Sequence, residues 1–461
     1  MRVAAAILKW AIVLFIAAVV GIGVWLYAAP PAMIRVGTGY AAKIVCSNVF
    51  LADRDPDAVL TDDVQAPGHP ILRLIDIDVD RSTGTVSAAL FGVFGESLAA
   101  HREGLGCAAV PDGELAAAQS QALMPAEPGG SDALWPAGDR VAPSQDQTIA
   151  AILDDPQMQG PGMRAIVVVH DGRIVAERYG EGFSSGTPLL GWSMTKTVNA
   201  AIVGTAVAAG RLELDDTGLL EGWTTDDRDD ITLAHLMAMS SGLAFNEDYG
   251  DVTDVTRMLY LEPDMAAFAA DKELVAALGE NFYYSSGTAV MLSRIWQNRF
   301  DDPQAALEWP RKALFGPLGM DSAILETDAS GTFVGSSYLY ATARDWARFG
   351  QFLLQGGVWN GEQILPPGFV TWMREPAPAS EGAYGRGQLW LHGPRAGTPE
   401  GEHSDSGFSL PDDALWLLGH DGQTTTVIPS QGLVVVRMGL TPSKLGYKPQ
   451  ALVEALVAAL Q

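Results

Sequence analysis

The sequence is poor in basic residues: 29 lysines and arginines stand against 55 acidic residues, and the formal net charge is −26. A surface this negative repels phosphate backbones, and no cluster of lysine or arginine offsets it, so the composition argues against nucleic acid as a partner. Charged residues make up only 18% of the 461 residues and hydrophobic residues 48%. That balance excludes a disordered chain and predicts a large hydrophobic core.

Cysteine is almost absent, with only Cys46 and Cys107 in the whole chain. Two cysteines cannot build a zinc or iron–sulfur site alone, and the seven histidines show no HExxH pairing, so we expect no metal and no cofactor. Outside the cytoplasm the pair can form a disulfide, whose loop of about 60 residues would contribute about 4 kcal/mol. Two buried thiols are the alternative, and the exported location inferred below favours the disulfide.

The longest run without a charged residue lies near the N-terminus, at residues 10–28. As a helix it would reach about 28 Å, which matches one hydrocarbon core, and we predict a transmembrane helix. Arg2 and Lys9 precede it, so residues 1–9 are expected in the cytoplasm and the rest outside it, in the periplasm if the source is Gram-negative. The alternative is a cleaved signal peptide, but the run is long for one and Pro30-Pro31 follow it.

Three further regions follow the predicted anchor. Residues 29–123 are interpreted as a small β-rich exported region, because residues 71–79 alternate in polarity and a Ser-Thr-Gly turn leads into a second such run. Residues 124–144, rich in proline, glycine and alanine at their start, are typical of a linker. The main domain is expected to span residues 145–461.

The main domain has strand patterns at both ends and helical patterns between them. Two strand-like runs near its start are joined by Asp171-Gly172, which suits a two-residue hairpin turn. A long helical run begins at Ser193, and the chain is mostly helical to about residue 375. Three more strands and a closing helix are expected at residues 414–419, 424–428, 433–438 and 449–460. This order predicts an α+β fold, an antiparallel sheet flanked by helices with a mostly helical subdomain.

The first chemically informative motif is Ser193-Met194-Thr195-Lys196. If Ser193 opens a helix, Lys196 lies one turn later on the same face, and its amine can reach the serine hydroxyl. The helix N-terminus would also favour negative charge that develops on a substrate. A free lysine cannot accept a proton at neutral pH, so burial must lower its pKa, and the apolar residues around the motif meet that need.

Two other motifs are less specific by themselves. Tyr284-Ser285-Ser286-Gly287 contains a phenol that can move a proton, although a buried tyrosine before a helix is the simpler interpretation and Tyr283 is a competitor. Gly419-His420-Asp421-Gly422-Gln423 joins two predicted strands. Its glycines allow close approach of a substrate to the backbone, although alone it is typical of a hairpin turn.

Taken together, these motifs resemble the serine β-lactamase and penicillin-binding-protein superfamily, in particular its class C-like esterases and the 6-aminohexanoate-dimer hydrolases. The resemblance covers about residues 145–461. It rests on Gly191-Trp192-Ser193-Met194-Thr195-Lys196, His235-Leu236-Met237-Ala238-Met239-Ser240-Ser241-Gly242-Leu243, Phe282-Tyr283-Tyr284-Ser285-Ser286-Gly287, Leu314-Phe315-Gly316-Pro317-Leu318-Gly319-Met320, Gly335-Ser336-Ser337-Tyr338 and Gly419-His420-Asp421-Gly422.

The resemblance implies a role for each motif. Ser193 would be acylated, while Lys196 and Tyr284 would move the protons. The backbone N–H groups of Ser193 and Gln423 would form the oxyanion hole. Ser286, His420 and Gly422 would bind the substrate, with His420-Asp421-Gly422 in place of the Lys-Thr-Gly strand of true β-lactamases.

Two departures from the family pattern narrow the expected substrate. Ser286 replaces the asparagine that binds the side-chain amide of a β-lactam, and His420 replaces a permanent positive charge by a titratable one. No class A deacylation glutamate is found either. We therefore expect a serine hydrolase of a small ester or a linear, non-peptide amide. The alternatives are a peptidoglycan D,D-peptidase or β-lactamase and, from another class, a catalytically silent membrane-tethered binding protein. The pocket is expected to be shaped by loops after Ser241, around Tyr249 and at residues 384–390.

Overall fold

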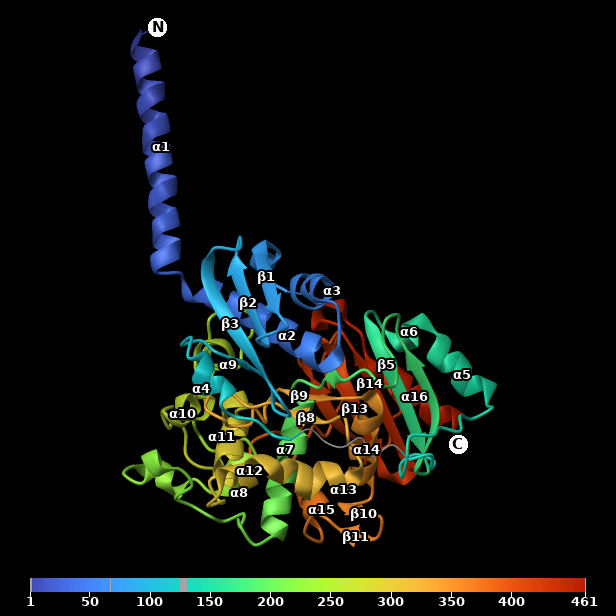
Figure 1. Ribbon diagram of the computed structural model, residues 1–461. Helices are drawn as coiled ribbons and strands as arrows, with labels where there is room; N and C mark the ends of the chain where they lie inside the picture. The colour runs from blue at the N-terminus through green and yellow to red at the C-terminus, as the bar shows by residue number, and fades with distance from the viewer. Residues whose placement is uncertain (1, 67, 125–130, 461) are drawn as a thin grey trace. The chain divides into compact units, whose positions relative to one another are not determined.

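A computed structural model describes residues 2–66, 68–124 and 131–460 (Figure 1). The chain divides into two compact units that do not follow the predicted boundaries. The first unit contains Met1–His101, Cys107–Gln119 and Asp248–Pro263, so a segment from the middle of the chain joins the N-terminal region. The second contains Arg102–Gly106, Ser120–Glu247 and Asp264–Gln461. Residues 125–130 of the predicted linker lie outside the described residues.

The first unit combines a four-stranded sheet with a helix that the sequence analysis did not predict. The sheet has the order β1-β2-β3-β4, with strands Ile75–Asp80, Thr85–Leu90, Phe94–Arg102 and Gly106–Ala109. The unexpected helix is α2, Ala32–Ala52. It is buried on almost every side, so its sequence lacks the polar stripe that identifies a surface helix. Helices α3 (Pro56–Val59), α4 (Leu115–Gln119) and α9 (Asp254–Leu261) complete the unit.

Cys46 and Cys107 form a disulfide that joins α2 to β4, with Cα atoms 6.1 Å apart. The bond ties the start of the unit to its last strand. At the N-terminus, helix α1 spans Arg2–Ala28, and its stretch Val3–Ala28 is long and apolar enough to cross a membrane. A signal sequence would meet the same criterion.

The second unit is built on a five-stranded sheet with the order β12-β13-β14-β5-β6. Its strands are Leu415–Gly419, Gln423–Ile428, Leu433–Gly439, Met163–His170 and Arg173–Tyr179, and every neighbouring pair is antiparallel. The α+β prediction is confirmed, including the closure of the sheet by strands from both ends of the domain. The turn between β5 and β6 uses Asp171 and Gly172 with φ of 49° and 74°, as a two-residue hairpin requires.

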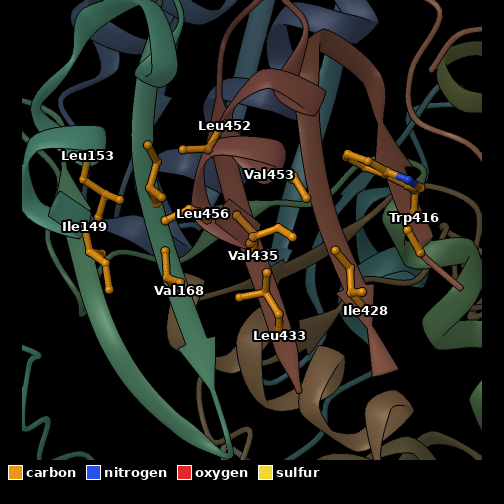
Figure 2. Close-up of a cluster of buried hydrophobic side chains, with 13 residues drawn as sticks. Ile149, Leu153, Val168, Trp416, Ile428, Leu433, Val435, Leu452, Val453 and Leu456 are labelled. Atoms are coloured by element: carbon orange, nitrogen blue, oxygen red, sulfur yellow. The ribbon is translucent and has the colours of Figure 1, made fainter. Parts of the chain in front are cut away.

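Helices cover both faces of this sheet. On one face, α16 (Pro449–Ala459) and α5 (Gln147–Asp154) pack their apolar side chains on the strands (Figure 2). On the other face lies α14 (Ala343–Leu354), where a Cβ on Gly350 would come within 2.5 Å of Val434. Leu433 and Val435, on either side of Val434 in the strand, face α16. Helices α14 and α16 therefore pack on opposite faces of β14.

The rest of the second unit is mostly helical and surrounds α7, Met194–Ala208, whose residues 194–206 are all buried. Buried polar side chains fix α7 to its neighbours; for example, Asn199 donates to the carbonyl of Ala289 at 2.8 Å. The remaining helices are α6 (Pro156–Gln159), α8 (Leu233–Met237), α10 (Met265–Ala270), α11 (Ser286–Gln297), α12 (Pro303–Pro310), α13 (Gly316–Leu318) and α15 (Phe369–Arg374), and the short strands are β7 (Leu189–Leu190), β8 (Ile324–Leu325), β9 (Leu339–Ala341), β10 (Val358–Trp359) and β11 (Glu362–Gln363).

The closing helix offers a test of this core. Leu456 of α16 is fully buried against the sheet, so Leu456→Ala should leave a cavity and lower the free energy of unfolding by about 3 kcal/mol. Leu445→Ala makes the same chemical change at an exposed position and should cost less than about 0.5 kcal/mol. Urea denaturation of the two variants measures the difference. Equal losses in the free energy of unfolding would show that burial of Leu456 in α16 does not stabilise the core.

Candidate active site

Ser193 stands immediately before α7, on a turn that is constrained from two sides. The preceding Trp192 has a φ of 48°, which is uncommon for a bulky residue. Gly191 has no room for a side chain, because a Cβ there would lie 2.1 Å from Trp346 of α14. The N–H of Met194 donates to the carbonyl of Gly191 at 3.2 Å. These constraints hold the Ser193 hydroxyl at the helix N-terminus, where backbone N–H groups lack intrahelical partners.

Lys196 is buried one turn later, and its amine contacts three oxygens. Nζ lies 3.0 Å from Ser193 Oγ, 3.0 Å from Ser286 Oγ and 3.1 Å from the carbonyl oxygen of Ser336. The three oxygens come from three separate parts of the chain: the turn before α7, the start of α11 and the segment before β9. A charged ammonium group can donate to all three.

Glu247, which was not predicted from the sequence, adds a carboxylate to this network. The backbone N–H of Ser286 donates to one of its oxygens at 2.7 Å, and the Ser286 hydroxyl donates to the other at 2.5 Å. The hydroxyl of Ser286, a residue predicted to bind substrate, lies between Lys196 and Glu247. No spacing rule links a glutamate 39 residues upstream to the serine, so only the fold brings the two together.

The hydrogen-bond inventory gives the network a direction. The carboxylate of Glu247 can only accept, so the Ser286 hydroxyl must donate to it and accept from Lys196. The carbonyl of Ser336 also can only accept. Two N–H bonds of Lys196 are thereby committed. When the amine loses its third proton, the free lone pair points to the remaining neighbour, Ser193 Oγ. A neutral Lys196 can thus accept a hydrogen bond from the Ser193 hydroxyl.

Burial makes the neutral amine accessible. Desolvation lowers the pKa of Lys196 from 10.5 to about 8, although the charge of Glu247 opposes the shift. At pH 7 about a tenth of the amine is then neutral, against fewer than one in a thousand for an exposed lysine. The arrangement can therefore serve as a base near neutral pH.

Tyr284 is the second proton-carrying group at this site. Its ring centroid lies 4.7 Å from the Lys196 amine, and the nearby Ser193 hydroxyl acts to lower the pKa of its phenol. Burial and the charge of Glu247 raise the pKa of Tyr284 far above its usual range, so the phenol keeps its proton at neutral pH. The neighbouring Tyr283 is 42% exposed, so of the two candidate tyrosines the structure brings Tyr284 to Ser193.

An aromatic cluster holds Tyr284 in place. The ring packs against Tyr384 and Trp390, with centroid distances of 5.8 and 5.4 Å, and Tyr384 and Trp390 pack against each other at 4.9 Å. The segment 384–390, expected to shape the pocket, therefore lies beside the predicted catalytic groups. Tyr249, which was also expected to shape the pocket, belongs to the first unit.

The turn between β12 and β13 lies against the Ser193 turn. A Cβ on Gly419 would come within 2.2 Å of the carbonyl oxygen of Gly191, and the ring of His420 packs edge-on against Trp192 at 5.6 Å. Gln423 stands opposite Gly419 in the strand register. Its side chain stabilises the turn by donating to the carbonyl of His420 at 3.2 Å, so any contribution of Gln423 to substrate comes from its backbone N–H.

A buried guanidinium supports this turn from behind. Arg437 of β14 is fully buried, and it donates to the carbonyl of Gly422 at 3.0 Å and to the carbonyls of Gln159 and Pro161 at 3.1 Å. Burial lowers the pKa of Arg437 to about 10, so the group still carries its charge at neutral pH. Arg437 was not predicted from the sequence either, because in a run of valines it has the pattern of a strand residue.

Comparison with known proteins shows the family of this chain. The family model described as Beta-lactamase matches residues 146–455, which is well over half of the chain. This chain belongs to the Beta-lactamase family. It is therefore a serine hydrolase of the β-lactamase type, and the predicted superfamily is confirmed.

Individual relatives of this β-lactamase-family chain are distant. A 6-aminohexanoate-dimer hydrolase from Paenarthrobacter ureafaciens is 25% identical over 293 residues, covering 57% of this chain and 71% of that protein. A penicillin-binding protein homologue from Caulobacter crescentus has a TM-score of 0.51 at 15% identity, over 70% of this chain and 99% of its own. A penicillin-binding protein from Bacillus halodurans has a TM-score of 0.51 at 16% identity, over 67% and 99%. These two structures show a shared fold.

The Lys196 network predicts a specific pH dependence. Only the neutral amine can accept a proton, so kcat/KM for p-nitrophenyl acetate should rise with pH and level off above about 8. The charge of Glu247 raises the pKa of Lys196, so Glu247→Gln, which keeps an acceptor for Ser286, should move the rising limb to lower pH. Glu280→Gln, an exposed carboxylate in the same unit, should leave the limb in place. If Glu247→Gln leaves the rising limb of the pH profile in place, this electrostatic role of Glu247 is contradicted.

Proposed function

We propose that the second unit hydrolyses a small ester or a linear amide through an acyl-enzyme on Ser193. The supporting observation is the amine of Lys196, 3.0 Å from Ser193 Oγ, with its two other hydrogen bonds committed to Ser286 and Ser336. An acceptor aimed at a serine hydroxyl, with a lowered pKa, is the arrangement that activates a nucleophile.

In the first half of the reaction, Ser193 Oγ forms a bond to the substrate carbonyl carbon while its proton passes to the neutral amine of Lys196. The carbonyl π pair moves to oxygen and gives a tetrahedral oxyanion. When this collapses, the bond to the leaving alcohol or amine breaks, and the leaving group takes a proton through Tyr284, which Lys196 replenishes. Tyr284 suits the task because its phenol is protonated at neutral pH and lies near the Ser193 hydroxyl.

In the second half, water attacks the acyl carbon and gives its proton to the same pair. The bond to Ser193 Oγ breaks, the serine recovers its proton, and a carboxylic acid leaves. Each half of the reaction passes through a tetrahedral oxyanion, and both oxyanions need hydrogen-bond donors at the same point. The N–H of Ser193 at the helix N-terminus and the N–H of Gln423 on β13 are the candidates, and each donor of this kind contributes about 3 kcal/mol. The contact between Gly419 and the Gly191 carbonyl supports the pairing, because it holds the two backbones together.

The substrate class follows from what surrounds these groups. Ser286 is engaged by Lys196 and Glu247, so it offers little to the side-chain amide of a β-lactam. His420 presents no permanent cation to a substrate carboxylate. An apolar wall beside the Ser193 hydroxyl is formed by Tyr284, Tyr384 and Trp390. These features suit a short acyl group without a carboxylate near the cleaved bond. The relative from Paenarthrobacter ureafaciens carries the name 6-aminohexanoate-dimer hydrolase, which agrees with this class.

The proposal predicts that Lys196→Ala lowers the acylation rate by at least about 10²-fold, because no other base reaches Ser193 Oγ in the described network. Lys444→Ala, at an exposed lysine, is the matched control and should retain wild-type activity. Stopped-flow hydrolysis of p-nitrophenyl esters gives the rates, and mass spectrometry after fluorophosphonate treatment should find the adduct on Ser193.

Other outcomes would redirect or overturn the assignment. An intact, folded protein that forms no adduct on Ser193 would favour a silent binding scaffold. Efficient nitrocefin turnover, or labelling by a fluorescent penicillin, would favour a β-lactamase or D,D-peptidase over an ester and amide hydrolase. A panel of p-nitrophenyl esters, short linear amides and nitrocefin separates these cases in one experiment.

We also propose that α1 is retained as a membrane anchor, with the enzyme on the non-cytoplasmic side. The apolar side chains of α1 are exposed along the helix. In addition, Phe91 and Val93, in the turn between β2 and β3, are 56% and 54% exposed, and the nearby Leu74 is 45% exposed. Among described residues after α1, only four other large apolar side chains are comparably exposed.

This apolar turn lies near the end of α1. A Cβ on Gly95, at the start of β3, would come within 2.7 Å of Ile34 and 3.2 Å of Pro30, both of which directly follow the helix. A membrane that contains α1 would therefore meet the turn at its interface, where partly exposed apolar side chains are favourable. A cleaved signal peptide gives no reason for such a turn.

The anchor predicts a purified membrane form whose intact mass includes residues 2–28 and which resists extraction by alkaline carbonate. The turn adds a second measurement. An environment-sensitive dye at Phe91→Cys should shift to shorter wavelength in proteoliposomes, whereas the same dye at Ser82→Cys, an exposed turn at the other end of the β1–β2 hairpin, should not. A mature chain that begins after residue 28 would refute the anchor.

A further inference from the structure

Two histidines and an aspartate converge away from the catalytic groups. His392, His403 and Asp405 each offer one ligand atom, and these atoms lie within 4.8 Å of one another. All three belong to the segment 391–414, which has no helix or strand. A loop of this length normally needs an internal tie or a function. No metal was expected from the sequence, because its two cysteines and seven histidines form no metal-binding motif of regular spacing.

Asp405 is held in place by its surroundings. The N–H of Gly393 donates to its two oxygens at 3.0 and 3.3 Å, and the side-chain amide of Gln450 donates to Oδ1 at 3.2 Å. Gln450 comes from α16, is fully buried, and also donates to the carbonyls of Pro394 and Ser404. Gly393 must be glycine, since a Cβ would lie 2.6 Å from Gln450 and 2.8 Å from Asp405.

The histidine geometry suits a small cation. His392 Nδ1 lies 3.4 Å from Asp405 Oδ2, which is about the distance between two ligands of tetrahedral zinc with bonds near 2.1 Å. The His392 and His403 rings meet at a centroid distance of 4.0 Å and an angle of 77°. His403 is exposed, so its ring can turn toward the other two ligands.

We propose that His392, His403 and Asp405 bind one divalent transition-metal ion of the zinc type. Two imidazoles and a carboxylate select such a metal over calcium or magnesium, which prefer oxygen ligands alone. Gly393 and Gln450 act as outer partners that orient the carboxylate. His403 Nδ1 accepts a hydrogen bond from the N–H of Asp405 at 3.2 Å, and metal binding replaces that contact.

The ion would fasten a segment that begins beside the catalytic groups. Trp390 pairs its backbone with Trp416 of β12 and packs its ring on Tyr284. His392 follows two residues later. Joining His392 to His403 and Asp405 closes the irregular segment on itself and limits its motion next to the aromatic wall. The ion has no part in the chemistry on Ser193, so the site stands whether or not the proposed reaction is correct.

The test uses the full chain in detergent after treatment with a chelator. Titration with ZnCl₂ in a calorimeter should give one tight site, and Co²⁺ should develop the visible absorption bands of a low-coordinate nitrogen and oxygen site. His403→Ala, an exposed change that leaves the fold intact, should weaken the affinity at least about tenfold. Asp405→Asn keeps an acceptor for Gly393 and Gln450 but removes the charge, and should also weaken binding at least about tenfold.

His170→Ala, at a histidine in the same unit outside the cluster, is the matched control and should bind zinc like the wild type. Zinc should also slow hydrogen exchange in the segment 391–414 of the wild type and not of His403→Ala. If no site is found, or if His403→Ala and Asp405→Asn bind like the wild type, the proposal is overturned, and the cluster is then a hydrogen-bonded tie without metal.

Discussion

The structure of the second unit depends on one buried amine. Lys196 can occupy its position only because three oxygens from separate segments accept its hydrogen bonds. A buried ammonium group without partners would cost several kcal/mol. The turn before α7, the start of α11 and the segment before β9 must therefore all arrive at the same point. The same burial that demands these partners also lowers the pKa of the amine to about 8.

The sheet supplies the second half of the site in an equally constrained way. Gly419 touches the Gly191 carbonyl, and Gly191 itself has no room beside Trp346. Two glycines far apart in sequence thus fix the distance between the serine turn and the β12–β13 turn. Arg437 then holds the second turn from the sheet side through Gly422. A side chain at Gly419 would push the two turns apart, and a side chain at Gly191 would collide with Trp346.

Prediction from sequence succeeded where a local pattern carried the information. The strands around Asp171-Gly172, the helix after Ser193 and the strands near the C-terminus follow from periodicity and turn chemistry. Helix α2 was not predicted, because burial on nearly all sides removes the periodicity that identifies a helix. Glu247, Arg437 and the histidine cluster were not predicted either, because each acts through a partner that only the tertiary fold brings near.

Glu247 shows why such residues matter and why they are costly. Its charge raises the pKa of Lys196 and so reduces the fraction of neutral amine. The same charge forces the Ser286 hydroxyl to donate away from Lys196, which fixes the direction of the lone pair toward Ser193. A neutral residue at position 247 would leave a larger fraction of Lys196 uncharged. The Ser286 hydroxyl, however, would then be free to turn. The network therefore exchanges part of the neutral-amine fraction for orientation, and burial of Lys196 lowers its pKa by more than Glu247 raises it.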